Sequence, residues 1–179
     1  KDYEPDHLHR ANDILSVLKK LTPSTVYCLD EEQAEFIEDL NRDFNVETDT
    51  LQDALTFCRC IKTDHELNLL RESARVNNIA HLEAMKALKP GMHEYEMKGV
   101  FDFHQTSNGL LQPAYTGIHA GGANSAILHY VENSGKINNG ELYLIDAGYE
   151  CEGYASDVTR TYPANGRFSG DQAAIYQIV

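Results

Sequence analysis

The stretch Glu141–Gly166 constrains the fold most, because it reads as two alternating strands joined by a short turn. If the turn is centred on Cys151-Glu152, Asp146 lies directly opposite Asp157. Opposed residues of antiparallel strands point to the same face, with Cβ atoms roughly 5 Å apart. The sequence therefore predicts a hairpin that carries two carboxylates side by side.

Two carboxylates this close repel each other, so a paired arrangement needs a shared proton or a bound cation. Oxygen ligands suit hard ions such as Mn²⁺ or Mg²⁺, and paired metal ions in hydrolytic sites lie about 3.5–4 Å apart. The residues alone also allow a plainer interpretation, in which Asp146 and Asp157 are solvated side chains at an exposed hairpin edge.

Helices precede this hairpin. Thr63-Asp64-His65-Glu66 has the pattern of a capping box, and the helix that it begins ends at Pro90-Gly91. A further helix is expected over about 94–107, strands from 111 onward, and a last helix over 169–179. The fold class predicted for this part is α+β.

The first third of the chain has a different pattern. We expect a helix over 8–21, a strand over 25–29 and a helix capped by Asp30, followed by a polar connector around 47–53. This order fits the end of an α/β domain. The sequence is therefore divided into a remnant of that domain over 1–55 and a second domain over 56–179.

Composition excludes several classes of function. The formal net charge of −13 argues against non-specific binding to nucleic acid or to an anionic membrane surface. No apolar run approaches the roughly 18 residues that cross a bilayer. Four cysteines are too few for a disulfide scaffold, and Cys58-Arg59-Cys60 has no second pair to complete a zinc site. We expect reduced thiols and a cytoplasmic protein.

Three motifs together identify a family. They are Asp146-Ala147-Gly148 with Asp157 eleven residues after the first aspartate, the string Ser156–Pro163 (SDVTRTYP), and Gly121–Tyr130 (GGANSAILHY). They resemble the prolidase and aminopeptidase P family of metallopeptidases, which have the pita-bread fold and cleave Xaa-Pro bonds. The resemblance implies that 56–179 is the first half of a pita-bread catalytic domain. It likewise implies that 1–55 is the end of an α/β N-terminal domain.

The resemblance also implies the site. Asp146 and Asp157 match the first two ligands of a centre of two divalent metal ions, with Mn²⁺ expected. His129 matches a catalytic residue that holds substrate and stabilises charge at the scissile bond, and Tyr115 matches an aromatic residue of the substrate pocket. The implied reaction is attack of metal-activated water on a proline-containing dipeptide or oligopeptide, in an enzyme that is commonly a homodimer.

The family's ligands come in the order Asp, Asp, His, Glu, Glu, but all eight histidines of this chain precede Asp146. Three ligands are therefore expected beyond Val179, and the chain by itself is expected to be inactive. One alternative is a non-catalytic pita-bread module that binds peptides or proteins. Another is a related hydrolase, such as a methionine aminopeptidase or a creatinase; the SDVTRTYP string and the preceding domain remnant argue against the former.

Overall fold

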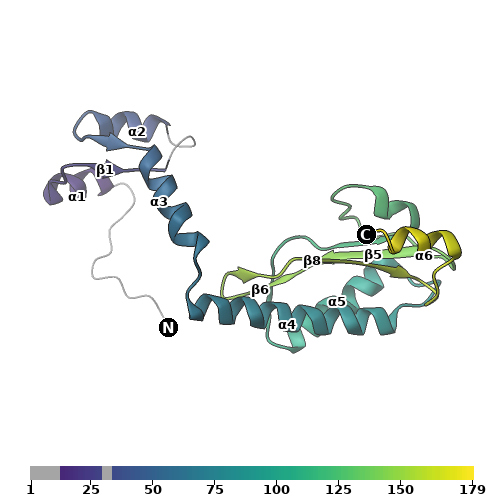
Figure 1. Cartoon of the computed structure of the whole chain (residues 1–179). Helices are drawn as coiled ribbons and strands as arrows, with labels where there is room; N and C mark the ends of the chain where they lie inside the picture. The colour runs from purple at the N-terminus through teal and green to yellow at the C-terminus, as the bar shows by residue number, and fades with distance from the viewer. Residues whose placement is uncertain (1–12, 30–33) are drawn as a thin grey trace. The chain divides into compact units, whose positions relative to one another are not determined.

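The computed structural model describes residues 13–29 and 34–179 (Figure 1), and these form two compact units that are divided between Lys62 and Thr63. The boundary predicted between residues 55 and 56 falls inside a helix, α3 (Asp49–Cys60). Within the described ranges, no helix combines the length and the apolar character that a membrane span requires.

The first unit alternates helices with short strands: α1 (Ile14–Leu21), β1 (Val26–Tyr27), α2 (Ala34–Asn41), β2 (Val46–Glu47) and α3. The two strands pair in parallel, with Val26 opposite Val46, which is the arrangement of an α/β layer. The predicted helix over 8–21 is confirmed from Ile14 onward, while residues 8–12 and the expected cap Asp30 lie outside the described residues.

The prediction of a polar connector around residues 47–53 is wrong. Helix α3 begins at Asp49 and occupies most of it. The apolar residues Leu51 and Leu55 lie one helical turn apart, and this spacing continues through Cys58. Every residue of α3 from Gln52 to Cys60 is exposed, so the polar side chains of this stretch lie on a solvent-facing helix and not on a connector.

The second unit begins with two long helices, α4 (Asp64–Ala87) and α5 (Glu94–Ser107), as predicted. The capping box that opens α4 is confirmed. The Thr63 backbone N–H donates to Glu66 Oε2 at 2.6 Å, and Thr63 Oγ1 accepts from the Glu66 backbone N–H at 3.3 Å. These two bonds satisfy donors that the first turn of a helix leaves without partners.

The strands form two small antiparallel sheets. The first has the order β4 (Ile118–Gly121), β5 (Leu142–Ala147), β8 (Val158–Pro163), and the second has the order β3 (Gln112–Pro113), β6 (Tyr149–Cys151), β7 (Tyr154–Ala155). Strands β5 and β6 form one arm of a long hairpin, and β7 and β8 form the other (Figure 1). A 3₁₀ turn, η2 (Gly122–Ala126), follows β4.

The hairpin is confirmed, but its predicted register is wrong by two residues. Cys151 pairs with Tyr154, so the turn is Glu152-Gly153, whose φ angles of 49° and 85° are both positive. Consequently Asp146 pairs with Thr159 and not with Asp157. Because the side-chain period of a strand is two, a slip of two residues keeps both aspartates on the predicted face.

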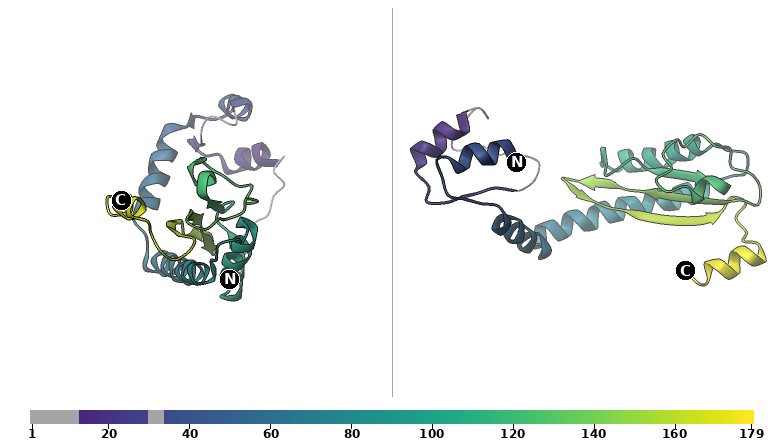
Figure 2. Two further views of the ribbon diagram at one scale, coloured as in Figure 1. Left: turned by 90° about the vertical axis from the view of Figure 1, so that its right-hand side faces the viewer. Right: turned by 90° about the horizontal axis from the view of Figure 1, so that it is seen from above.

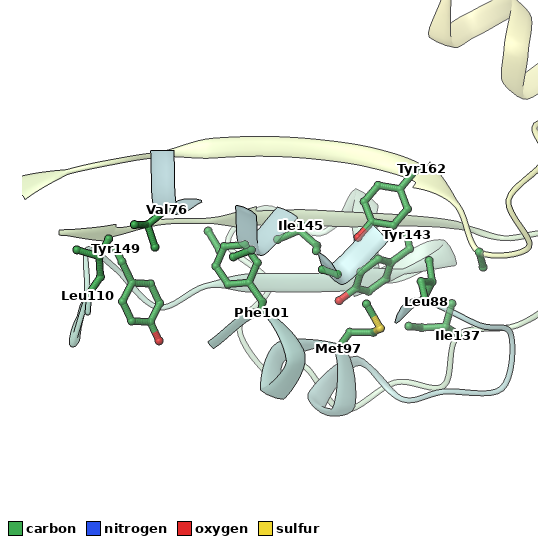
Figure 3. Packing of buried hydrophobic residues seen from close by; sticks show 14 residues of the cluster. Val76, Leu88, Met97, Phe101, Leu110, Ile137, Tyr143, Ile145, Tyr149 and Tyr162 are labelled. Carbon is green, nitrogen blue, oxygen red and sulfur yellow. The ribbon is translucent and has the colours of Figure 1, made fainter. Parts of the chain in front are cut away.

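The core lies between the sheet and the two helices. On β5 the residues Tyr143, Ile145 and Ala147 are buried, while the alternate residues are only partly covered. The buried side packs against the helices (Figure 3), whose contributing residues are Val76, Ala80 and Ala84 of α4 and Met97 and Phe101 of α5. Asp146 therefore lies on the face of the sheet that the helices do not cover.

The last helix, α6 (Gly170–Tyr176), follows the end of β8, as the yellow helix in Figure 2 shows. Ser169 caps it: Ser169 Oγ accepts from the Gln172 backbone N–H at 3.3 Å, and the Gln172 side chain bonds the Ser169 N–H in return. The helix predicted over 169–179 is confirmed over this shorter range.

Candidate metal centre

Regular strand structure breaks at facing positions in the two arms of the hairpin. Gly148 separates β5 from β6, and Ser156-Asp157 separates β7 from β8. The chains pass so close here that a Cβ on Gly148 would lie 1.8 Å from the Ser156 carbonyl oxygen. Only glycine permits this approach. The interruption places Asp157 beside the end of the strand that carries Asp146.

Tyr115 joins the two aspartates. Its hydroxyl oxygen lies 2.5 Å from Asp146 Oδ1 and 2.6 Å from Asp157 Oδ1. A phenol carries one hydrogen, so it donates to only one of the two carboxylates at a time. Burial, together with the bonds to the two carboxylates, raises the pKa of Tyr115 far above its ordinary value, so the hydroxyl stays protonated. The structure thus brings together three of the predicted site residues.

The two carboxylates fit a hard divalent ion. Within the described part of the chain, the Oδ2 atom of neither Asp146 nor Asp157 has a hydrogen-bond partner, so each carboxylate has an oxygen free to bind a cation. Residues 13–29 and 34–179 hold no group of three or more His, Cys, Asp and Glu side chains that could hold a metal ion. Asp146 and Asp157 are thus the carboxylates that this cluster offers to a cation, and their role as metal ligands stays a prediction.

His129 is exposed and follows η2 on a segment with unusual backbone geometry, since its φ is +54°. Among the described residues, no hydrogen bond or ion pair joins His129 to Asp146, Asp157 or Tyr115. The catalytic role of this histidine therefore stays a prediction.

Sequence reasoning missed two polar side chains of α4 that bond the backbone on either side of Gly148, where β5 ends and β6 begins. Ser73 Oγ donates to the Tyr149 carbonyl at 2.7 Å, and Asn77 Nδ2 donates to the Ala147 carbonyl at 3.2 Å. These carbonyls flank Gly148 on either side. The available signal is that both residues, one helical turn apart, fall on the buried stripe of α4 together with Val76, Ala80 and Ala84.

A second polar link reinforces this support. Gln105 of α5 donates from Nε2 to Asn77 Oδ1 at 2.6 Å, and both side chains are buried. Buried amides that bond each other and a backbone carbonyl fix one relative position of helix and strand, because leaving such groups unpaired is costly. The position of the strand end beyond Asp146 is thereby set by both helices.

A cavity of about 210 Å³ lies behind Tyr115. Its wall includes Tyr115, Gly148 and a polar group in which the Tyr149 hydroxyl donates to Asp102 Oδ1 at 3.0 Å while Lys98 pairs with the same carboxylate. Burial raises the pKa of Tyr149, as does the neighbouring charge of Asp102. Tyr115 thus lines this cavity, and its hydroxyl contacts the two carboxylates.

Comparisons with known proteins identify the family. Residues 68–179 match the model of metallopeptidase family M24. The chain is 38% identical over 191 residues to the Xaa-Pro dipeptidase of Rattus norvegicus, a match that covers 99% of this chain and 38% of the rat protein. It is 42% identical over 121 residues to the Xaa-Pro aminopeptidase of Escherichia coli strain K12, covering 68% of this chain and 27% of that protein.

Solved structures agree. Proline aminopeptidase P II from Yersinia pestis superimposes with a TM-score of 0.82 at 32% identity, covering 94% of this chain and 42% of the other. Aminopeptidase PepP from Pseudomonas aeruginosa gives a TM-score of 0.80 at 36% identity, with 94% and 41% covered. The α+β class and the partial pita-bread domain predicted from the sequence are confirmed.

The chain spans 38% of the length of the rat dipeptidase and 42% of that of the Yersinia enzyme. The M24 match covers most of α4 together with α5, both sheets and α6, and so includes Tyr115 and the paired aspartates. Members of this family are metallopeptidases, which agrees with a cluster of carboxylates suited to a divalent cation. The chain belongs to metallopeptidase family M24.

Proposed function

We propose that this chain supplies the first two ligands and part of the substrate pocket of a metal-dependent Xaa-Pro peptidase. One observation carries the proposal: Asp146 and Asp157 are held within 2.6 Å of a single tyrosine hydroxyl oxygen, on a face of the sheet that the helices leave uncovered. Carboxylates brought together in this way destabilise a sheet unless a cation or a proton offsets their repulsion.

The proposed cofactor is a pair of divalent ions, with Mn²⁺ favoured because the ligands present are carboxylate oxygens. Asp146 and Asp157 would bind these ions, and the remaining ligands would come from residues outside 1–179. Bound to such a centre, the ions supply an acidified water as nucleophile and a charge that polarises the peptide carbonyl.

Tyr115 acquires a second role in this proposal. The sequence resemblance assigns it to the substrate pocket, and the cavity that Tyr115 lines supports that assignment. Its hydroxyl also contacts one oxygen of each aspartate, and the other oxygen of each would be free to bind the metal ions. Hydrogen bonds to ligand oxygens from an outer layer of residues commonly hold metal ligands in position.

His129 is proposed to contact the substrate and to stabilise charge that develops on the carbonyl of the scissile bond. The substrates proposed are dipeptides or oligopeptides with proline in the second position, on the strength of the similarity to Xaa-Pro dipeptidases and aminopeptidases. A homodimer belongs to the same proposal and is tested by measuring the molar mass in solution. A cytoplasmic location is supported by the four cysteines, which are all free.

The test compares two Asp→Asn substitutions in the complete protein. Asp157→Asn should reduce Mn²⁺-dependent release of proline from an Xaa-Pro peptide by more than about 100-fold, beyond the loss typical of outer-layer partners, and should leave the circular dichroism spectrum unchanged. Asp171→Asn is the matched control, because Asp171 is an exposed residue in the first turn of α6. Its turnover should equal that of the unmodified protein.

Undiminished turnover of the Asp157→Asn protein with added Mn²⁺ would refute the metal assignment. An unmodified protein that binds Xaa-Pro peptides and metal but never cleaves them would instead establish the non-catalytic binding module. Calorimetric titration with the peptide alongside the proline-release assay separates these two results.

A further inference from the structure

Glu94 is the first residue of α5, and its side chain is completely buried, with an exposed fraction of 0%. Its carboxylate accepts four hydrogen bonds. Oε1 accepts from the Gly121 backbone N–H at 2.7 Å and from Asn124 Nδ2 at 2.9 Å. Oε2 accepts from the Tyr130 hydroxyl at 2.7 Å and from the Gly135 backbone N–H at 2.6 Å.

All four donors belong to one segment, residues 121–135, which leaves the end of β4, passes through η2 and returns to the start of α5. Among the described residues, no Lys or Arg side chain pairs with Glu94. Burial opposes the charged form, but the four donors outweigh it and lower the pKa of Glu94 below its ordinary value. An ionised carboxylate therefore sits at the centre of this segment, stabilised by hydrogen bonds alone.

The donors also fit against one another. Asn124 Nδ2 donates to the Tyr130 hydroxyl oxygen at 3.0 Å as well as to Glu94. A Cβ at Gly135 would lie 2.6 Å from Asn124 Nδ2 and 2.9 Å from Glu94 Oε1, so a larger residue there would displace both. In this arrangement all four hydrogen bonds to the carboxylate form at once, and the close packing at Gly135 leaves little room for the donors to move.

His129 directly precedes Tyr130, the residue whose hydroxyl Glu94 holds. The backbone of His129 is left-handed, with φ +54°, a conformation that costs a non-glycine residue roughly 1–2 kcal/mol. A residue keeps such a conformation only where its surroundings impose it. The bonds from Glu94 to both ends of the segment, and to the residue next to His129, provide that constraint.

We propose that Glu94 is a positioning residue, whose buried carboxylate holds residues 121–135 in the conformation that presents His129 to the substrate. This inference rests on the proposed function, which assigns His129 to the substrate. It explains two further residues of the GGANSAILHY string: Asn124 and Tyr130 act on the carboxylate of Glu94 and not on the substrate. The role requires a carboxylate, because an amide would place an N–H₂ group against two donors.

Glu94 does not cap the start of α5, because the capping residue is Glu96. Glu96 Oε2 accepts from the His93 backbone N–H at 2.7 Å, and the Glu96 side chain is exposed. Glu96→Gln is therefore the matched control for Glu94→Gln. It makes the same chemical change two residues away on the same helix, at a carboxylate that does not contact residues 121–135.

The first measurement follows the segment itself in the complete protein with Mg²⁺ as a diamagnetic metal. In heteronuclear NMR spectra with ¹⁵N-glycine and ¹³C-histidine labels, Glu94→Gln should shift the Gly121 and Gly135 amide signals upfield, because N–H groups lose a charged acceptor. The ring signals of His129 should move or broaden. In the Glu96→Gln protein the signals of Gly121, Gly135 and His129 should stay at the chemical shifts of the unmodified protein.

The second measurement is a double-mutant cycle on Xaa-Pro turnover with Mn²⁺. Glu94→Gln alone should lower kcat by about 10-fold or more, in the range of outer-layer partners, with metal content unchanged. In a His129→Ala background the same substitution should lower kcat by less than about 2-fold, because the group through which it acts is gone. Glu96→Gln should leave kcat unchanged in both backgrounds.

If Glu94→Gln lowers kcat by the same factor in the His129→Ala background as in the unmodified protein, the proposal is overturned. Signals of Gly121, Gly135 and His129 that do not move in the Glu94→Gln protein would also overturn it. If Glu94→Gln does not fold, Tyr130→Phe replaces it. This variant removes one hydroxyl, and it should change the His129 signals and turnover in the same direction by a smaller factor; unchanged His129 signals in it would also overturn the proposal. A wild-type protein without Xaa-Pro turnover would refute the proposed function, and the NMR arm would still decide whether Glu94 holds the segment.

Discussion

Gly148 and Ser156 lie in such close contact that a Cβ at Gly148 would be 1.8 Å from the carbonyl oxygen of Ser156. Atoms of the backbone cannot move aside as a flexible side chain can. Gly148→Ala should therefore separate the two arms of the hairpin, lower the free energy of unfolding by more than about 3 kcal/mol and move Asp157 away from Asp146. Urea denaturation followed by circular dichroism measures the first effect, and metal content after dialysis measures the second.

Gly99→Ala supplies the control for this substitution. Gly99 is exposed within α5, and a Cβ there would meet nothing within 4 Å. Alanine is a better helix former than glycine, so this variant should be more stable by up to about 1 kcal/mol. A Gly148→Ala protein as stable as the Gly99→Ala protein would contradict the close contact.

The buried amide of Asn77 provides a second prediction. Asn77→Ala leaves Gln105 Nε2 and the Ala147 carbonyl without their partner and opens a small cavity, so it should lower the free energy of unfolding by about 2–4 kcal/mol. Asn78→Ala, at an exposed neighbour on the same helix, should be neutral or slightly stabilising. Equal urea midpoints for the two variants would show that the buried link contributes nothing.

The hairpin shows how far the sequence could predict the fold. Strand alternation places Asp146 on one side of the strand and Tyr143 and Ile145 on the other, because a period of two follows directly from strand geometry, and the structure buries the second side. The register depended on the turn, and the turn was assigned to Cys151-Glu152. Of the two candidate turns, only Glu152-Gly153 places a glycine at the second position, which a two-residue turn with two positive φ angles favours.

The site, too, could be predicted only in part. The paired aspartates could be predicted because a short hairpin keeps them near each other in the sequence. The supporting groups could not, because they come from distant segments: Ser73 is 76 residues from its acceptor Tyr149, and Glu94 is 41 residues from its donor Gly135. A polar residue on an apolar helical stripe indicates that a buried partner exists but not which residue it is.

Tyr115→Phe tests the orienting role of the hydroxyl. Without the hydroxyl, Asp146 and Asp157 lose the one hydrogen-bond donor that they share, and nothing offsets the repulsion between the two carboxylates in the absence of metal. The affinity for Mn²⁺ should fall by about 10- to 100-fold, the range seen when an outer-layer partner is removed. Competition with a chelating dye measures this affinity.

The ring remains in the Tyr115→Phe protein, so contacts of the substrate with the pocket should persist. Tyr115→Ala removes the ring as well and should raise KM more than it lowers kcat at saturating Mn²⁺. If Tyr115→Phe binds Mn²⁺ as tightly as the unmodified protein, the hydroxyl does not orient the ligands.

His119 predicts how stability depends on pH. It is completely buried, its Nδ1 lies 3.0 Å from the Tyr143 hydroxyl and its ring contacts the edge of Phe101. Burial is the main cause that lowers the pKa of His119 to about 4, with the charge of Lys98 acting in the same direction and that of Asp102 opposing it. The folded protein therefore holds this ring neutral at pH values where the unfolded chain protonates it.

The sign follows from linkage. Above the unfolded pKa of about 6.5 neither state binds a proton at this position; between 6.5 and about 4 only the unfolded state does, so stability falls as the pH falls. At pH 5 the loss from His119 alone amounts to about 2 kcal/mol relative to pH 8. Burial also lowers the pKa of His81, which adds a loss of the same sign.

Urea denaturation of the unmodified protein at pH 8, 6.5 and 5 should show this loss. His119→Gln should be less stable at pH 8, because it removes a packed ring, but its stability should fall less steeply between pH 6.5 and 5, because one of the two buried histidines is gone. The comparison of slopes decides the question, since a purely structural effect of the substitution shifts all three points equally. Parallel pH profiles would mean that the protonation of His119 is not linked to folding.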